Sequence, residues 1–374
     1  MAKKMSRFVG TTILLVLLPA LALCSYPWPD NVTQHKGYIE VNKTHGVNLF
    51  YWFFESRSNP ASDPLVVWLT GGPGCSSELA LLTENGPFLI NGTADPVYNP
   101  YGWNAVSNLL YVDQPAGTGF SYVTNPLGYE TNERQIATEL WDFIRQFYQL
   151  YPKYSTLDLY IFGESYAGHY VPATGQVIVE SNSIYAKNLK GIGIGNGWVD
   201  PLLQYADYSK YMLMEGLIDQ STADAAADLY TGCKDLIDLG LYGPAFFECQ
   251  FIESFVLGAA EIKAGRSINV YDIREKCEHP PLCYNMDNIT EFLNKPEVME
   301  DLGVKRKWEA CRKIEELLLI GDWVHSFQSA AGIVLGHGRR VVAYSGKDDF
   351  ICNYLGGKDW VESTKWSGQA CIII

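Results

Sequence analysis

The segment GESYA at residues 163–167 contains a serine in the setting that a nucleophile requires. A short apolar run at 159–162 precedes the segment, and a stretch compatible with a helix follows it. A strand, a sharp turn that carries the serine and a helix together form a nucleophile elbow. Such a turn needs small neighbours, here Gly163 and Ala167, and it points the N–H of Tyr166 at a bound carbonyl group. The segment therefore predicts covalent acyl chemistry at Ser165.

A glycine-rich stretch upstream, TGGPGCSS at 70–77, can supply the remainder of the acyl-transfer site. A serine hydroxyl needs a base, a group that orients the base and a preformed oxyanion hole. Glycine lets the backbone approach a substrate closely, so we expect the N–H groups of Gly72 and Tyr166 to form this hole. The alternative is a tight turn that needs glycine only for its conformation. The strand that precedes the stretch, together with the elbow downstream, favours the oxyanion hole.

Apolar strands that alternate with helices are expected to position these loops. Apolar residues at helical spacing predict a helix between Asn132 and Leu150, capped by Asn132 with Gln135 three residues later. This alternation predicts a mainly parallel sheet flanked by helices, with the catalytic loops at the carboxyl ends of the strands. The predicted strands are 37–41 and 46–54, which form a hairpin, and 64–69, 109–112, 159–162, 189–194 and 340–344.

Residues 201–325 interrupt the alternation of strands and helices. This stretch is rich in helix-forming residues, contains five cysteines and lacks a clear buried strand, so we expect an inserted, mostly helical lid that forms much of the substrate pocket. The expected organisation is a signal peptide at 1–24, the first part of the core at 25–200, the lid at 201–325 and the second part of the core at 326–374.

Composition and the N-terminus restrict the compartment and the partners. The chain has 374 residues and a net charge of −14, which argues against binding to nucleic acid. Basic residues followed by an apolar run at 8–23 predict a secretory signal peptide cleaved before Ser25. A membrane anchor is the alternative, but the run is short and contains Pro19. We expect no membrane association after cleavage, and neither a metal nor a cofactor.

Entry into the secretory pathway gives the sequons and the cysteines a meaning. Nine cysteines are present, and eight remain once Cys24 is removed with the signal peptide. Most should form disulfides, and Cys277 with Cys283 is expected to close a small loop, although sequence does not give the connectivity. The four predicted glycosylation sites are Asn31, Asn42, Asn91 and Asn288.

Five motifs carry a family resemblance: WLTGGPGCSS (68–77), DQPAGTGFSY (113–122), GESYAG (163–168), GNG (195–197) and DFICN (349–353). Together they resemble the serine carboxypeptidases of the carboxypeptidase Y type. The resemblance runs from about residue 37 to residue 369, and its five motifs occur in order along the chain. It implies an α/β-hydrolase fold with an inserted lid and an enzyme that removes C-terminal residues from peptides, most effectively at acidic pH. Members of the family occur in vacuoles, lysosomes or secretions.

Motif by motif, the resemblance implies roles for individual residues. Ser165 would be the nucleophile and Asp349 the acid, with Gly72 and Tyr166 as the oxyanion hole. The substrate's terminal carboxylate would be bound by Thr70, Gly71, Glu84 and Glu164. Two carboxylic acids bind a substrate carboxylate only if they share a proton, which requires pKa values raised by burial and mutual repulsion. The alternative role for Glu84 is that of a solvated helix residue. The implied disulfides are Cys75–Cys311, Cys233–Cys249 and Cys277–Cys283, with Cys352 unpaired.

Two departures from the family pattern bear on the activity. Thr70 stands where the peptidases usually have asparagine, and threonine at this position also occurs in the plant acyltransferase branch of the family. That branch usually has aspartate directly before the nucleophile, whereas this chain has Glu164, as the peptidases do. All the histidines precede Asp349, whereas the family base follows the acid, so we interpret the sequence as truncated before that base. Prenylation of the terminal CIII is an alternative that secretory entry disfavours. His169 and His337 are poor substitutes for the base. The histidines are His35, His45, His169, His279, His325 and His337.

The sequence thus predicts a serine-type carboxypeptidase that acts through an acyl-enzyme on Ser165. Its partners would be peptides with a free C-terminal carboxylate, and the protein would be a monomer or homodimer in a vacuole, a lysosome or the extracellular space. The alternatives are a catalytically impaired secreted binding protein and an acyltransferase of the same family.

Overall fold

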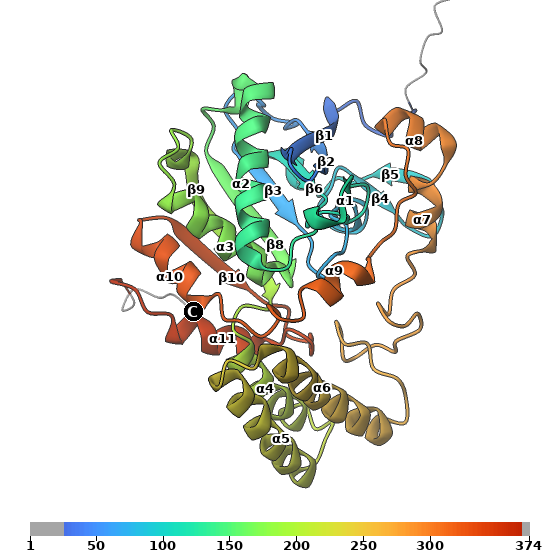
Figure 1. The fold of residues 1–374 in the computed structure, drawn as a ribbon. Helices are drawn as coiled ribbons and strands as arrows, with labels where there is room; N and C mark the ends of the chain where they lie inside the picture. Colours follow the sequence, from blue (N-terminus) through green and yellow to red (C-terminus); the bar gives the residue numbers. More distant parts are fainter. Residues whose placement is uncertain (1–25, 369–374) are drawn as a thin grey trace, which may run out of the picture.

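The computed structural model describes residues 26–368, which form a central sheet with helices on both faces (Figure 1). The predicted signal peptide and the terminal CIII lie outside these residues. No helix between 26 and 368 has the length and apolar character that a membrane span requires.

The central sheet is mixed and mostly parallel. β3, β6, β8, β9 and β10 run parallel to one another, and β1 and β2 form an antiparallel hairpin at one edge. The predicted parallel sheet and hairpin are confirmed, and the fold is that of an α/β-hydrolase. In spatial order the strands are β1 (Gln34–Asn42), β2 (Val47–Phe54), β6 (Asn108–Val112), β3 (Leu65–Leu69), β8 (Leu159–Ser165), β9 (Leu189–Gly197) and β10 (Arg340–Tyr344).

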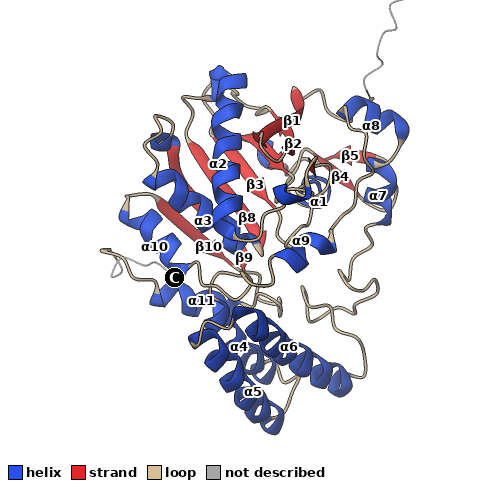
Figure 2. Ribbon diagram, in the orientation of Figure 1, coloured by secondary structure: helices blue, strands red, loops and turns tan. Residues whose placement is uncertain are grey.

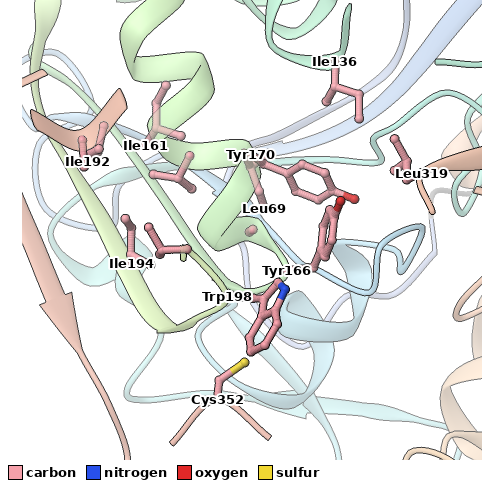
Figure 3. Packing of buried hydrophobic residues seen from close by; sticks show 14 of the residues in the cluster. Leu69, Ile136, Ile161, Tyr166, Tyr170, Ile192, Ile194, Trp198, Leu319 and Cys352 are labelled. Carbon is pink, nitrogen blue, oxygen red and sulfur yellow. The ribbon is translucent and has the colours of Figure 1, made fainter. Parts of the chain in front are cut away.

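Both faces of the middle strands are buried. In β3 the side chains of Leu65, Val67 and Leu69 enter one apolar cluster, and Val66 and Trp68 enter the other, as the period of two in a strand dictates. Figure 3 shows Leu69 in the first cluster with residues of β8, β9 and α3. β10 is the edge strand among the described residues, and its Val342 is 48% exposed.

Helices cover the sheet on both sides (Figure 2). Residues of α2, α3, α10 and α11 enter the first cluster, and residues of α1 enter the second. The predicted cap of α2 is present, because the Asn132 side chain accepts the N–H of Gln135 at 3.1 Å. The core helices are α1 (Glu78–Thr83), α2 (Glu133–Leu150), α3 (Ala167–Glu180), α10 (Gln328–Gly336) and α11 (Tyr354–Ser363).

The expected lid segment contains two groups of helices. Three long helices, α4 (Pro201–Met214), α5 (Gln220–Asp238) and α6 (Tyr242–Ala264), pack on one another at the bottom of Figure 1. The short helices α7 (Asp287–Leu293) and α8 (Pro296–Leu302) instead pack into the second cluster of the core, and α9 (Lys313–Leu318) follows them. The boundaries at 201 and 325 remain a prediction.

Smaller elements connect these parts. A two-residue strand pairs with β2, and a separate two-stranded sheet lies beside α1. These strands are β7 (Tyr122–Val123), β4 (Phe88–Ile90) and β5 (Pro96–Tyr98), and the 3₁₀ helices are Trp103–Ala105, Pro126–Gly128, Pro152–Tyr154 and Ala186–Asn188.

Three disulfides fasten the loops and the helices, and they are the pairs that the family resemblance implies. Cys75–Cys311 ties the glycine-rich loop to the segment before α9, Cys233–Cys249 joins α5 to α6, and Cys277–Cys283 closes a short loop. Cys352 is buried and has no disulfide partner among the described residues.

Candidate active site

The predicted nucleophile lies on a strained turn between β8 and α3. Ser165 has φ +56°, a left-handed conformation that is costly for a residue with a side chain. A Cβ on Gly163 would lie 2.6 Å from the carbonyl oxygen of Leu69 and 2.7 Å from the Cβ of Ala167. The turn therefore tolerates only small neighbours. Ser165 itself is partly exposed.

The glycine-rich loop lies directly against this turn. A Cβ on Gly71 would lie 2.4 Å from the backbone nitrogen of Tyr166 and 3.0 Å from the Cβ of Ser165. Gly72 follows with φ +115°, which favours glycine. The peptide between Gly71 and Gly72 thus lies beside the Tyr166 N–H, and together these groups can stabilise an oxyanion.

The two predicted carboxylate-binding acids share a hydrogen bond at the edge of the same loop. Burial, followed by the charge of Glu84, raises the pKa of Glu164 well above its usual range. Burial of its carboxyl group also raises the pKa of Glu84, although the residue as a whole is exposed. The Thr70 hydroxyl approaches Glu164 Oε1 at 3.5 Å, a weak contact. Repulsion and burial therefore favour one shared proton in this pair at acidic pH.

The predicted acid, Asp349, is buried at the end of the loop that follows β10. Its Oδ2 accepts the side-chain N–H of Asn196 at 2.6 Å, and its Oδ1 accepts the backbone N–H of Cys352 at 3.3 Å. Burial raises the pKa of Asp349 to about 7, and the Asn196 hydrogen bond is the largest opposing cause.

A segment between α6 and α7, residues 269–273, holds the acid loop through its backbone. The N–H groups of Phe350 and Ile351 donate to the carbonyl of Val270 at 2.9 and 3.1 Å, and the N–H of Ile273 donates to the carbonyl of Asp348 at 2.9 Å. The expected lid segment therefore contacts the candidate acid loop.

No histidine among residues 26–368 hydrogen-bonds to Ser165 or Asp349. His169 is buried, and its two ring nitrogens lie 2.5 and 3.2 Å from the carbonyl oxygens of Trp198 and Trp323. Burial lowers the pKa of His169 to about 4, so a neutral ring donates to one of these carbonyls. His337 is exposed and lies 3.0 Å from the carbonyl of Ile333. These contacts give both rings structural roles.

A second buried carboxyl pair, which the sequence analysis did not identify, supports the glycine-rich loop. Asp113 accepts the backbone N–H groups of Ser77 and Phe120 at 3.1 and 2.7 Å, and Glu78 accepts the hydroxyl of Ser76 at 2.5 Å. Burial raises the pKa of both acids. The motif at 113–122 was the available signal for Asp113. The pair joins the loop at 113–120 to the loop at 70–77.

Several known proteins of one family are similar to this chain. A profile of the serine carboxypeptidase family matches residues 25–372. The chain is 40% identical over 358 residues to "Serine carboxypeptidase S10 family member 1" of Dictyostelium discoideum, covering 95% of this chain and 85% of that protein. It is also 40% identical over 348 residues to "Serine carboxypeptidase-like 49" of Arabidopsis thaliana, covering 92% and 67%.

A solved structure is similar over most of the chain. It is a crystal structure of Kex1, a prohormone-processing carboxypeptidase from Saccharomyces cerevisiae, with a TM-score of 0.80 and 26% sequence identity. The similarity covers 91% of this chain and 79% of that one.

Proposed function

The chain belongs to the serine carboxypeptidase family, and we propose that it removes the last residue of a peptide through an acyl-enzyme on Ser165. The adjacency of two groups carries this proposal: the strained Ser165 directly follows Glu164, whose carboxyl group shares a hydrogen bond with Glu84. If the pair binds the terminal carboxylate of a peptide, the adjacent nucleophile lies near the last peptide bond of that chain.

Recognition of the chain end depends on the shared proton. The substrate carboxylate would accept hydrogen bonds from the protonated pair, from the Thr70 hydroxyl and from the backbone of Gly71. A peptide bond inside a chain has no carboxylate to take part in this sharing. As pH rises and the pair loses its proton, two negative charges would repel the substrate carboxylate, so binding weakens.

The bond changes follow acyl transfer. The Ser165 Oγ attacks the carbonyl carbon of the last peptide bond, and the negative charge on the carbonyl oxygen is stabilised by the N–H groups of Gly72 and Tyr166. The hydroxyl proton passes through a base to the leaving amine as the carbon–nitrogen bond breaks. Water then hydrolyses the ester, which releases the shortened peptide and restores the hydroxyl.

Asp349 would orient the base. An imidazole N–H is the usual partner of such a buried carboxylate. Among residues 26–368, no histidine hydrogen-bonds to Asp349 or Ser165.

The test is hydrolysis of an N-blocked dipeptide, with the C-terminal amide of the same dipeptide as a matched substrate. We expect cleavage of the free acid only, at acidic pH, and no cleavage by Ser165→Ala. Equal cleavage of acid and amide would refute the carboxylate-binding role of Glu84 and Glu164. Binding of the acid without turnover would favour the secreted binding protein, and consumption of acyl-glucose donors alone would favour the acyltransferase, whose threonine Thr70 matches.

We propose the secretory pathway, with a vacuolar, lysosomal or extracellular destination, for this protein, as is typical of the family. The oligomeric state is proposed to be a monomer or a homodimer, which sedimentation of the deglycosylated protein would distinguish.

A further inference from the structure

Asn196 is an extra residue in the strand that neighbours the nucleophile. β9 pairs with β8 so that Gly195 lies opposite Glu164, and the next pair is Gly197 opposite Ser165. Asn196 is therefore bulged out of the ladder, beside the turn that carries Ser165. Its φ is +40°, one of few positive values at a residue other than glycine among those described. A bulge of this kind redirects a side chain.

Both polar atoms of the Asn196 side chain are used. Its Oδ1 accepts the backbone N–H of Gly346 at 3.0 Å, which fixes the orientation of the amide because a backbone N–H can only donate. Its Nδ2 then points at Asp349 Oδ2, at 2.6 Å. Beyond the bulge, the N–H of Trp198 donates to the carbonyl of Ser165 at 2.9 Å. One bulge thus contacts both the nucleophile turn and the acid loop.

No other side chain among the described residues donates a hydrogen bond to the Asp349 carboxylate. The remaining donors to it are backbone N–H groups of the acid loop itself. The hydroxyls of Tyr208 and Tyr211, on α4, donate instead to the carbonyls of Ile351 and Lys347, each at 2.9 Å. The other titratable groups around Asp349 are Glu253 on α6, Tyr271, Cys352 and the Asp348–Arg274 ion pair.

We propose that Asn196 is a positioning residue that fixes the Asp349 carboxylate relative to Ser165 and favours its ionised form. The proposal rests on the function proposed above, in which Asp349 orients the base. A neutral amide donor stabilises a buried carboxylate without adding a second charge nearby. Because the bulged end of β9 contacts both Asp349 and the Ser165 turn, this one segment sets the distance between the acid and the nucleophile.

The test is a pH titration of Asp349, monitored by ¹³C NMR of protein labelled at the aspartate carboxyl carbons. The Asp349 signal is assigned by its loss in Asp349→Asn. Asn196→Gly keeps the positive φ and removes the donor. We expect the midpoint of Asp349 to rise by about one pH unit or more. Asn188→Gly is the matched control, because Asn188 is also buried and amide-bonded, to the carbonyl of Ser155 at 2.7 Å, but precedes the opposite end of β9. It should leave the midpoint unchanged.

Asn196→Asp provides a second variant, which keeps the shape and tolerates a positive φ but adds a negative charge. It should raise the midpoint further than Asn196→Gly. An unmoved midpoint in either folded variant, or an equal shift in Asn188→Gly, would overturn the proposal.

Turnover gives an independent readout. With an N-blocked dipeptide, loss of the Asn196 donor should lower kcat by about tenfold to a hundredfold and leave KM nearly unchanged. It should also shift the acidic limb of the pH–rate profile to higher pH. The NMR titration needs no turnover. A shifted midpoint in a protein without peptidase activity would therefore count against the proposed function and not against the Asn196–Asp349 contact.

Discussion

Gly71→Ala should damage the site while leaving most of the fold in place. The added methyl would lie 2.4 Å from the backbone nitrogen of Tyr166 and 2.8 Å from the carbonyl oxygen of Glu164. Ordinary van der Waals contacts begin near 3.4 Å, so the two backbones must separate by up to about 1 Å. Neither neighbour is a flexible side chain, because both atoms belong to the strand and turn that hold Ser165.

The structure gives this substitution two measurable costs. Overpacking of a tight site lowers the free energy of unfolding by about 1–3 kcal/mol, which denaturant titration measures. Separation of the loop from the elbow also pulls Gly71 away from the substrate carboxylate. Loss of one such interaction weakens binding of an N-blocked dipeptide by about tenfold, which calorimetry measures.

Gly258→Ala is the matched control for Gly71→Ala. Gly258 lies within α6, and a Cβ there would meet no atom within 4 Å. This control should leave binding unchanged and stabilise the protein by up to about 1 kcal/mol. If Gly71→Ala kept wild-type stability and dipeptide affinity, the close approach of loop and elbow would be disproved.

Three further predictions concern pH, glycans and the base. Burial raises the pKa of Asp349 and of Glu315 to about 7 from ordinary values of 3.8 and 4.5, so the folded state binds these protons more tightly and stability falls as pH rises from about 4 to 7. Tm should therefore be higher at pH 5 than at pH 7.5, with a smaller difference in Asp349→Asn, and a Tm that rises over this interval would contradict the sign. Glycopeptide mass spectrometry should find Asn31 and Asn91, both exposed, occupied more fully than Asn42, whose amide donates to Glu139 Oε1 at 3.0 Å; a higher occupancy at Asn42 would count against this order. Added imidazole should accelerate dipeptide hydrolysis by residues 25–374 about tenfold or more, in a saturable way, and Ser165→Ala should show no such effect; an equal acceleration in that variant would exclude rescue at this site.

Sequence predicted the parts of the site whose requirements are local. The elbow around Ser165 and the loop at 70–77 have small residues because neighbouring backbone atoms exclude side chains, and that need is visible in the residue types. The buried strands and the Asn132 cap were predicted for the same reason, since a period of two and a capping residue are local patterns.

The contacts that sequence reasoning missed depend on pairing between distant segments. Asn196 is aimed at Asp349 only because β9 contains one more residue than β8 requires at that point, and a shift in register is not written in either strand alone. The GNG motif marked the place without giving its partner. Asp113 with Glu78, and Val270 with Phe350, likewise meet only after the sheet and the insertion have folded.

The three backbone hydrogen bonds between residues 269–273 and the acid loop also bear on protein engineering. A transplanted insertion from a relative would bring its own geometry to the loop that holds Asp349, even if every residue around the scissile bond were preserved. Attempts to alter substrate preference by exchanging the whole insertion should therefore change turnover as well. Grafts confined to α4–α6, which leave 269–273 native, offer a way to separate the two properties.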